Sequence, residues 1–397
     1  MDQNKEMRQA ELDGLRGFAA LTVVLAHLTA AFRPQMYFGI ENGLTENVQT
    51  WFANSPLFVL VNGSFGVYIF FVLSGFVISA SADRSRSGFL KTALARCVRL
   101  SLPCAASIFF SALLMSAVLA NSEGAAQIVG HWWIKKQLIV TPQPWWQVMK
   151  EAAGWYYVTG ESLLNGALWT MQVELIGSLI IYAVFYSFTA RMHRFMIAAG
   201  LSVAVIYFYI TPFYYLCFVA GSLLYLLRNE VMKLPSMLAG IVLLTGIVLG
   251  GKSFFPPPAG TFYDGIYHGF ALFHAEAYIW TLGASLLVAG VLTFQPAKIF
   301  LSNRLSRFLG RLSFSVYLLH FPLLIVLMTN LFVTWGSASS AAYIATAIIY
   351  ICTVYALGFV FTFMIDEPAI RLSHRIRHGE LKENSSLADA EAREDHP

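Results

Sequence analysis

Long apolar stretches recur along almost the whole chain and are separated by shorter polar stretches. A transmembrane helix needs about 20 mostly apolar residues, and ten stretches reach or approach that length. They are approximately 12–32, 63–81, 101–120, 168–188, 194–210, 213–228, 234–251, 275–293, 309–333 and 339–366. The pattern predicts an all-α polytopic membrane protein with about ten transmembrane helices, of which the fifth to seventh are the shortest.

The composition agrees with this pattern. Of the 397 residues, 57% are hydrophobic and only 12% are charged, whereas about 25% are charged in an average soluble domain. The partner that this composition implies is a lipid bilayer, and we expect no nucleic-acid partner. The four cysteines show no metal or redox spacing, so we expect them to be buried small residues, without a disulfide or a metal site. They are Cys97, Cys104, Cys217 and Cys352.

The basic residues predict the orientation. If the N-terminus is cytoplasmic, most lysines and arginines fall on the inner side, and the outer loops hold only Arg33, Lys135, Lys136, Lys150 and Lys252. The positive-inside rule therefore places both termini in the cytoplasm. We expect a cytoplasmic segment 1–11, a transmembrane domain 12–375 and a disordered polar tail 376–397. The protein would lie in the inner membrane if its source is bacterial.

The first apolar stretch carries a histidine, His27, deep inside it, and an arginine, Arg16, near its start. Eleven helical residues bring the two onto nearly one face, about 16 Å apart along the axis. Asp13, one turn before Arg16, can offset its charge. Lys5 and Arg8 before an apolar run also suit a signal peptide, but the many later apolar stretches argue against that. An ionisable group at membrane depth marks a functional site; the alternative is a structural histidine bonded to a neighbouring helix.

The fourth stretch carries Glu174, with Thr170 and Ser178 at four-residue spacing on the same face. Glu174 and His27 lie at a similar predicted depth, and a carboxylate can orient an imidazole and stabilise its protonated form. We therefore predict that Glu174 orients His27. The alternative is a carboxyl group that caps a neighbouring backbone or stays protonated.

Three other residues, Ser74, Tyr317 and His320, are weaker candidates. Ser74 belongs to a set of small residues, with Gly63, Gly66 and Gly75, that permits close helix packing. In the ninth stretch Ser313, Tyr317 and His320 share one face, ahead of Pro322, which should kink the helix. His320 is either a second catalytic group or a structural one.

Arg96 and Arg99 stand three residues apart beside the predicted start of the third helix, on the cytoplasmic side. Such a pair suits a phosphate or diphosphate. The alternative is that these charges serve only topology and lipid headgroups.

The predicted outer loop 121–167 holds five of the nine tryptophans. They can form an interfacial aromatic belt or a platform on which a sugar ring stacks. The five are Trp132, Trp133, Trp145, Trp146 and Trp155.

Five motifs together resemble the acyltransferase 3 family of integral membrane acyltransferases. They are LDGLRGFAALTVVLAHL, FFVLSGFVIS, LWTMQVELIGSLI, LGRLSFSVYLLHFPLL and DEPAIRLSHR, in the family's order, and they span most of the chain from Glu11 to Arg375. The resemblance implies transfer of an acyl group, usually acetyl, from cytoplasmic acyl-CoA to a hydroxyl, commonly on a carbohydrate or glycoconjugate. It maps the essential histidine onto His27, the acidic candidate onto Glu174, and the donor-binding pair onto Arg96 and Arg99. Many relatives have two adjacent acids in the fourth motif, whereas Glu174 is followed by Leu175.

The sequence thus predicts an O-acetyltransferase that uses acetyl-CoA or another acyl-CoA and no metal. His27 would be the general base, Glu174 would orient it, and Arg16 would hold the thioester end or a phosphate of the donor. A transporter with His27, Glu174 and His320 as a proton relay is the alternative. No inverted repeat supports it.

Overall fold

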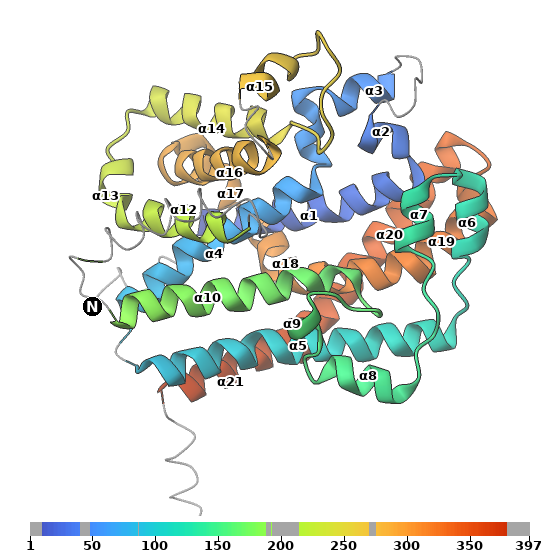
Figure 1. The fold of residues 1–397 in the computed structure, drawn as a ribbon, viewed down its shortest axis with the longest axis horizontal. Helices are drawn as coiled ribbons and strands as arrows, with labels where there is room; N and C mark the ends of the chain where they lie inside the picture. Colours follow the sequence, from blue (N-terminus) through green and yellow to red (C-terminus); the bar gives the residue numbers. More distant parts are fainter. Residues whose placement is uncertain are drawn as a thin grey trace, which may run out of the picture.

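The computed structural model describes residues 10–39, 48–85, 87–187, 192, 214–269 and 275–378, which form helices and no strand (Figure 1). In this part of the chain seven helices are long and apolar enough to cross a membrane. They are Ala10–Phe32, Gly63–Asp83, Phe89–Ala117, Gly166–Ser187, Glu276–Thr293, Arg304–Gly336 and Ser340–His378. Tyr214–Leu226 and Ser236–Gly250 are shorter apolar helices. The all-α polytopic prediction is confirmed; the predicted span 194–210 and the tail after His378 lie outside the described residues.

Helix α1 (Ala10–Phe32) lies at the centre, between α18 (Arg304–Leu323) and α4 (Gly63–Asp83). Glycines allow the close approach: a Cβ on Gly17 would lie 2.5 Å from the Gly310 nitrogen, and one on Gly63 would lie 2.5 Å from Ala26 Cβ. The predicted packing role of the glycines in α4 is thereby confirmed, since a Cβ on Gly75 would meet a carbonyl of α12 (Tyr214–Leu226) at 2.3 Å.

The other long helices flank this centre. Helix α5 (Phe89–Ala117) packs against α10 (Trp169–Ser187) and α21 (Glu367–His378), and α14 (Ser236–Gly250) packs against α16 (Ala275–Thr293). Helix α20 (Ser340–Phe361) runs through a π-helical stretch, Thr362–Asp366, directly into α21. Helices α1, α5 and α18 begin, and α21 ends, at one end of the bundle, on the left in Figure 1. We call it the arginine end because of the side chains described below.

Short helices complete the described fold, most of them at the opposite end. They are α2 (Pro34–Phe38), α3 (Val48–Ala53), a 3-10 helix (Pro56–Leu60), α6 (Ser122–Val129), α7 (Trp132–Gln137), α8 (Trp145–Ala152), α9 (Tyr156–Thr159), a 3-10 helix (Gly166–Leu168), α13 (Arg228–Val231), α15 (Asp264–Gly269) and α17 (Gln295–Leu301).

The start predicted for the third helix is wrong by twelve residues, because α5 begins at Phe89. Arg96 and Arg99 therefore lie inside the helix rather than beside its first residue. Their charges are tolerated there because carboxylates on neighbouring helices pair with both guanidinium groups.

Helix α18 passes through Pro322 without ending. Proline has no N–H, so the carbonyl of Leu318 loses its helical hydrogen bond. The buried side chain of Asn165 supplies a substitute, because its Nδ2 donates to that carbonyl at 2.8 Å. After Pro322 the chain continues as a π-helical stretch, Leu324–Met328, then α19 (Thr329–Leu331) and a second π-helical stretch, Phe332–Gly336.

Candidate active site

Two histidines from neighbouring helices form a pair in the half of the bundle away from the arginine end. Nε2 of His320 lies 3.0 Å from Nδ1 of His27. His320 is fully buried, and its Nδ1 lies 2.7 Å from the backbone oxygen of Tyr317. His27 is half-buried, with the ring of Phe321 edge-on at 5.3 Å and that of Trp133 at 6.0 Å. The partner of His27 is thus a second histidine.

Glu174 has other partners. Its Oε1 accepts hydrogen bonds from Arg96 Nη2 and, at 2.7 Å, from Ser74 Oγ. Ser178 Oγ accepts from Arg96 Nε at 3.0 Å. The predicted contact between Glu174 and His27 is therefore replaced by two separate clusters. Similar depth does not give two side chains the same direction: Glu174 points to α4 and α5, whereas His27 points to α18.

Two further ion pairs involve the carboxylates Asp366 and Glu367, which were not predicted as site residues. Arg99 Nη1 lies 2.5 Å from Asp366 Oδ1, and Arg311 Nε lies 2.8 Å from Glu367 Oε1. Asp366 is buried, 3% exposed. Asp366 could have been recognised from the sequence, because it is a carboxylate at the end of an apolar stretch, in the motif DEPAIRLSHR.

A cavity of about 820 Å³ brings most of the predicted site residues together. Its walls come from α1, α4, α5, α10, α18, the π-helical stretch Thr362–Asp366 and α21. Among its lining residues are Arg16, Ser74, Arg96, Arg99, Glu174 and Tyr317. His27 and His320 belong to the part of the chain that the structure describes, but they do not line this cavity. The donor-pair, acid and serine candidates therefore share one cavity, and the histidine pair lies outside it.

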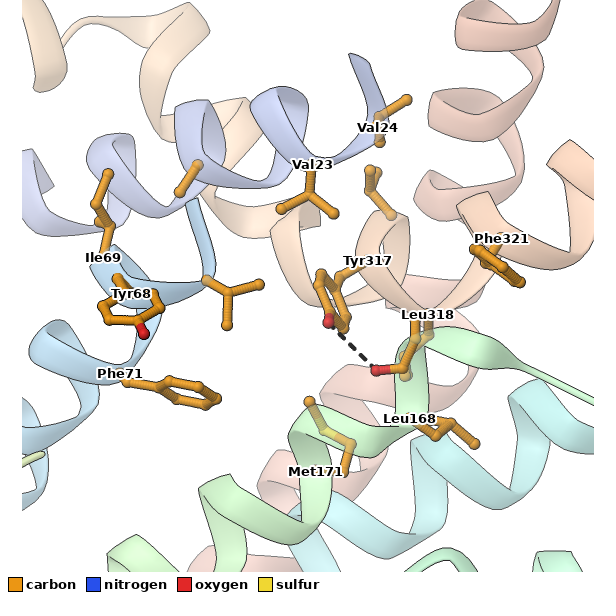
Figure 2. Close-up of a cluster of buried hydrophobic side chains, with 14 of the residues drawn as sticks. Val23, Val24, Tyr68, Ile69, Phe71, Leu168, Met171, Tyr317, Leu318 and Phe321 are labelled. Carbon is orange, nitrogen blue, oxygen red and sulfur yellow. Dashed lines mark hydrogen bonds between the residues drawn. The ribbon is translucent and has the colours of Figure 1, made fainter. Parts of the chain in front are cut away.

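Tyr317 stands between the cavity and the histidines. Its hydroxyl lies 2.9 Å from Thr170 Oγ1 and 3.2 Å from the carbonyl oxygen of Ala167, a bond drawn in Figure 2. Thr170 Oγ1 itself donates to Ala167 at 2.9 Å. The ring of Tyr317 lies 5.6 Å from that of His320, one helical turn further along α18. Tyr317 is thus the wall that the cavity and the histidine pair share.

The five tryptophans of the 121–167 region differ in their surroundings. Trp132, Trp145, Trp146 and Trp155 are 40–68% exposed. Trp133 is half-buried, beside His27. Phe38 stacks on His131 at 4.6 Å and lies 5.7 Å from Trp132. Of the five tryptophans, Trp133 is thus the one beside His27, while Trp132 lies in a separate contact with Phe38.

No group of three or more histidine, cysteine, aspartate or glutamate side chains suited to a metal ion occurs among the described residues. The four cysteines are free thiols; Cys104 and Cys217 are buried as expected, whereas Cys97 is half-buried and Cys352 is exposed. Its helix, α20, has many outward apolar side chains, as a helix facing lipid would.

Comparison with known proteins gave one finding. A family model described as an acyltransferase domain matches residues 9–365. No curated protein matches the chain, and no solved structure matches it.

Proposed function

The chain belongs to the acyltransferase family whose model spans residues 9–365, and from this premise we propose that it is a membrane O-acetyltransferase. The donor would be acetyl-CoA, or another acyl-CoA, entering from the cytoplasm. The acceptor would be a hydroxyl group of a carbohydrate or glycoconjugate. The observation that carries the proposal is a cavity that runs from the arginine end to Tyr317, with a histidine pair directly behind that residue.

The hydrogen bonds of the pair favour one basic atom. A carbonyl oxygen can only accept, so His320 donates from Nδ1 to Tyr317 and its neutral ring carries no proton on Nε2. That Nε2 then accepts from Nδ1–H of His27. His27 is left with an unprotonated Nε2, which is the atom that a general base needs.

The reaction then follows from this proton arrangement. His27 Nε2 takes the proton of the acceptor hydroxyl while the hydroxyl oxygen attacks the carbonyl carbon of the thioester. The C–S bond breaks, the acyl group stays on the oxygen, and the imidazolium returns its proton to the CoA thiolate. His320 shares the positive charge on His27 while the proton is held there.

Glu174 and Arg16 would act on the donor side. Glu174 holds the guanidinium of Arg96 against the cavity wall through a buried ion pair, so we assign it a positioning role. Arg16 lines the cavity near the start of α1, where it can contact the donor.

The acceptor would approach His27 from the other end. Trp133 contacts His27, and the rings of Phe38, His131 and Trp132 lie next to one another there. Apolar ring faces with polar rims suit a sugar. An interfacial belt remains the competing interpretation for the exposed tryptophans.

The second candidate, a proton-coupled transporter, needs His27, Glu174 and His320 in one relay. The hydrogen bond between the two histidines favours it. Against it, Glu174 is engaged with Arg96 and Ser74, and the family is one of acyltransferases.

The experiment is transfer by purified protein in lipid nanodiscs. Release of free CoA from acetyl-CoA, and acetyl groups on the product, should depend on a carbohydrate acceptor and on His27. Proton uptake by sealed proteoliposomes without CoA release would favour the transporter.

A further inference from the structure

The cavity opens at the arginine end among four arginines from three helices. They are Arg16 on α1, Arg307 and Arg311 on α18, and Arg371 on α21. Two carboxylates line the same part of the cavity. Asp13 lies 3.8 Å from Arg16, and Glu367 bonds to Arg311. Four arginines against two carboxylates leave an excess of two positive charges at this opening.

The excess belongs to Arg307 and Arg371. Both side chains are exposed, both line the cavity, and neither has an ion pair or side-chain hydrogen bond to any residue in the described part of the chain. The pair Arg311–Glu367 fixes their relative level. Arg307 precedes Arg311 by one turn, and Arg371 follows Glu367 by one turn. Because α18 begins and α21 ends at the arginine end, both steps lead toward the opening by about 6 Å. Arg307 and Arg371 thus stand at about the same level on their two helices, on the side of the opening.

The arginines deeper in the cavity differ from these two. Arg96 is paired with Glu174 and Arg99 with Asp366, so their charges are already offset. They suit the uncharged part of a donor better than its phosphates, which revises the role that the sequence suggested for them. A polyanion would be attracted to the opening, where the net charge is positive.

We propose that Arg307 and Arg371 form the phosphate subsite of the donor, binding the diphosphate and ribose phosphate of CoA at the cavity opening. The proposal rests on the proposed function, which makes acyl-CoA the donor. Guanidinium forks recognise phosphate oxygens in a bidentate manner. Two forks facing one opening suit a ligand with several phosphate groups.

The length of the donor fits this placement. Ten residues separate Arg307 from Tyr317 along α18, a rise of roughly 15 Å. The pantetheine arm has about twelve chain bonds, comparable to about four extended residues or roughly 13–14 Å. A donor with its diphosphate on Arg307 and Arg371 therefore brings its thioester to Tyr317, next to the histidine pair.

The test is binding of CoA itself, which requires no transfer. The dissociation constant is measured by calorimetry in nanodiscs of zwitterionic lipid, for the wild type and for the double variant Arg307→Gln/Arg371→Gln. Loss of charge-assisted phosphate contacts should raise it at least about tenfold and flatten its salt dependence. The dissociation constant of pantetheine, which lacks phosphate, should not change. Thermal unfolding checks that the variant is folded.

The matched control is Arg304→Gln/Arg375→Gln. It removes the same two charges from the same two helices, one turn further out, at exposed positions that do not line the cavity. CoA binding should keep its wild-type strength. An equal loss of CoA affinity in both double variants would show that only the general surface charge matters, and it would overturn the proposal. Normal CoA binding by Arg307→Gln/Arg371→Gln would also overturn it.

Lipid headgroups carry the same phosphate chemistry, and a further arm separates the two sources. Measurements are repeated in nanodiscs with phosphatidylglycerol. A wild-type affinity for CoA that does not depend on this lipid supports the donor subsite. If phosphatidylglycerol weakens CoA binding by the wild type but not by the double variant, the site binds lipid phosphate instead of the donor. Failure of the proposed function looks different: the wild type then binds no CoA, or binds it and transfers nothing to any acceptor.

Discussion

At the scale of single residues, the chemistry depends on which atoms carry protons. In the proposed mechanism His320 donates from Nδ1 to the carbonyl of Tyr317, which leaves Nε2 of His27 as the basic atom of the pair. His27 and His320 are 293 positions apart in the chain and lie on different helices, α1 and α18. Their function as a unit can be tested by combining substitutions.

We expect His27→Ala to lower kcat by about 10²–10⁴-fold, the usual contribution of a general base. His320→Ala should lower kcat less, because it removes only the group that orients the ring and shares its charge. If the two residues act as a unit, the double variant should be scarcely worse than His27→Ala. Steady-state kinetics with saturating donor measure this, and fully additive losses would contradict the pairing.

Tyr317 should keep the thioester from water. We expect Tyr317→Ala, which opens the wall between the cavity and the histidines, to raise CoA release in the absence of acceptor while transfer to acceptor falls. Tyr317→Phe keeps the ring and loses only the hydrogen bonds to Thr170 and Ala167. Its CoA release in the absence of acceptor should therefore rise less than that of Tyr317→Ala.

The matched control for this pair is Tyr350→Phe. Tyr350 is fully buried and does not line the cavity, and its hydroxyl donates to the backbone oxygen of His320. The ratio of hydrolysis to transfer is measured for all three variants. An unchanged ratio of hydrolysis to transfer in Tyr317→Ala would contradict the proposal that Tyr317 keeps the thioester from water.

At the scale of elements, α18 depends on a residue outside itself. Pro322 leaves the carbonyl of Leu318 without its helical donor, and Asn165 from the loop before α10 replaces it. The same Asn165 caps the following turn, where its Oδ1 accepts from the nitrogen of Ala167 at 3.2 Å. The loop thus holds both the start of α10 and the helix that carries Tyr317 and His320.

Asn165→Ala should therefore destabilise the protein by about 1–3 kcal/mol, the cost of a buried group left without its hydrogen bond. In a Pro322→Ala background the restored N–H can bond to Leu318, so the same change should cost measurably less. Thermal unfolding of the four proteins in one detergent measures the coupling. Equal costs in both backgrounds would show that Asn165 acts through its other contacts.

At the scale of the whole molecule, stability combines a buried apolar interior with a few buried charges. Lys252 follows α14, outside the membrane-spanning helices, and is fully buried. Its Nζ donates to the carbonyl of Phe255 at 2.8 Å and lies over the ring of Tyr267. Burial lowers the pKa of Lys252 to about 8, partly opposed by the nearby Glu276.

This pKa gives stability a defined pH dependence. Between about pH 8 and the ordinary lysine pKa near 10.4, the unfolded chain binds more protons at this residue than the folded protein does. The contribution of Lys252 to stability should therefore rise as the pH is raised through this window. As the pH is raised from 7 to 10, the Tm of the wild type should therefore rise relative to the Tm of Lys252→Met. A constant difference would show that Lys252 keeps its ordinary pKa.

Much of the architecture was determined by sequence alone. The lengths of the apolar stretches gave the helices α1, α4, α10 and α16 nearly to the residue, because hydrophobicity and length are local properties. The motifs likewise indicated the family that the matched model later showed. His27, Glu174, Tyr317 and His320 were recognisable as polar groups on apolar helices.

Only the tertiary structure decided how these groups combine. The rotation of each helix about its axis sets the direction of a side chain, and packing against distant helices fixes that rotation. His27 therefore bonds to His320, while Glu174 bonds to Arg96. The same reason explains the early start of α5, since the carboxylates that make Arg96 and Arg99 tolerable lie 78 and 267 positions away in the chain. Sequence thus determined which groups enter the membrane, and packing determined which of them meet.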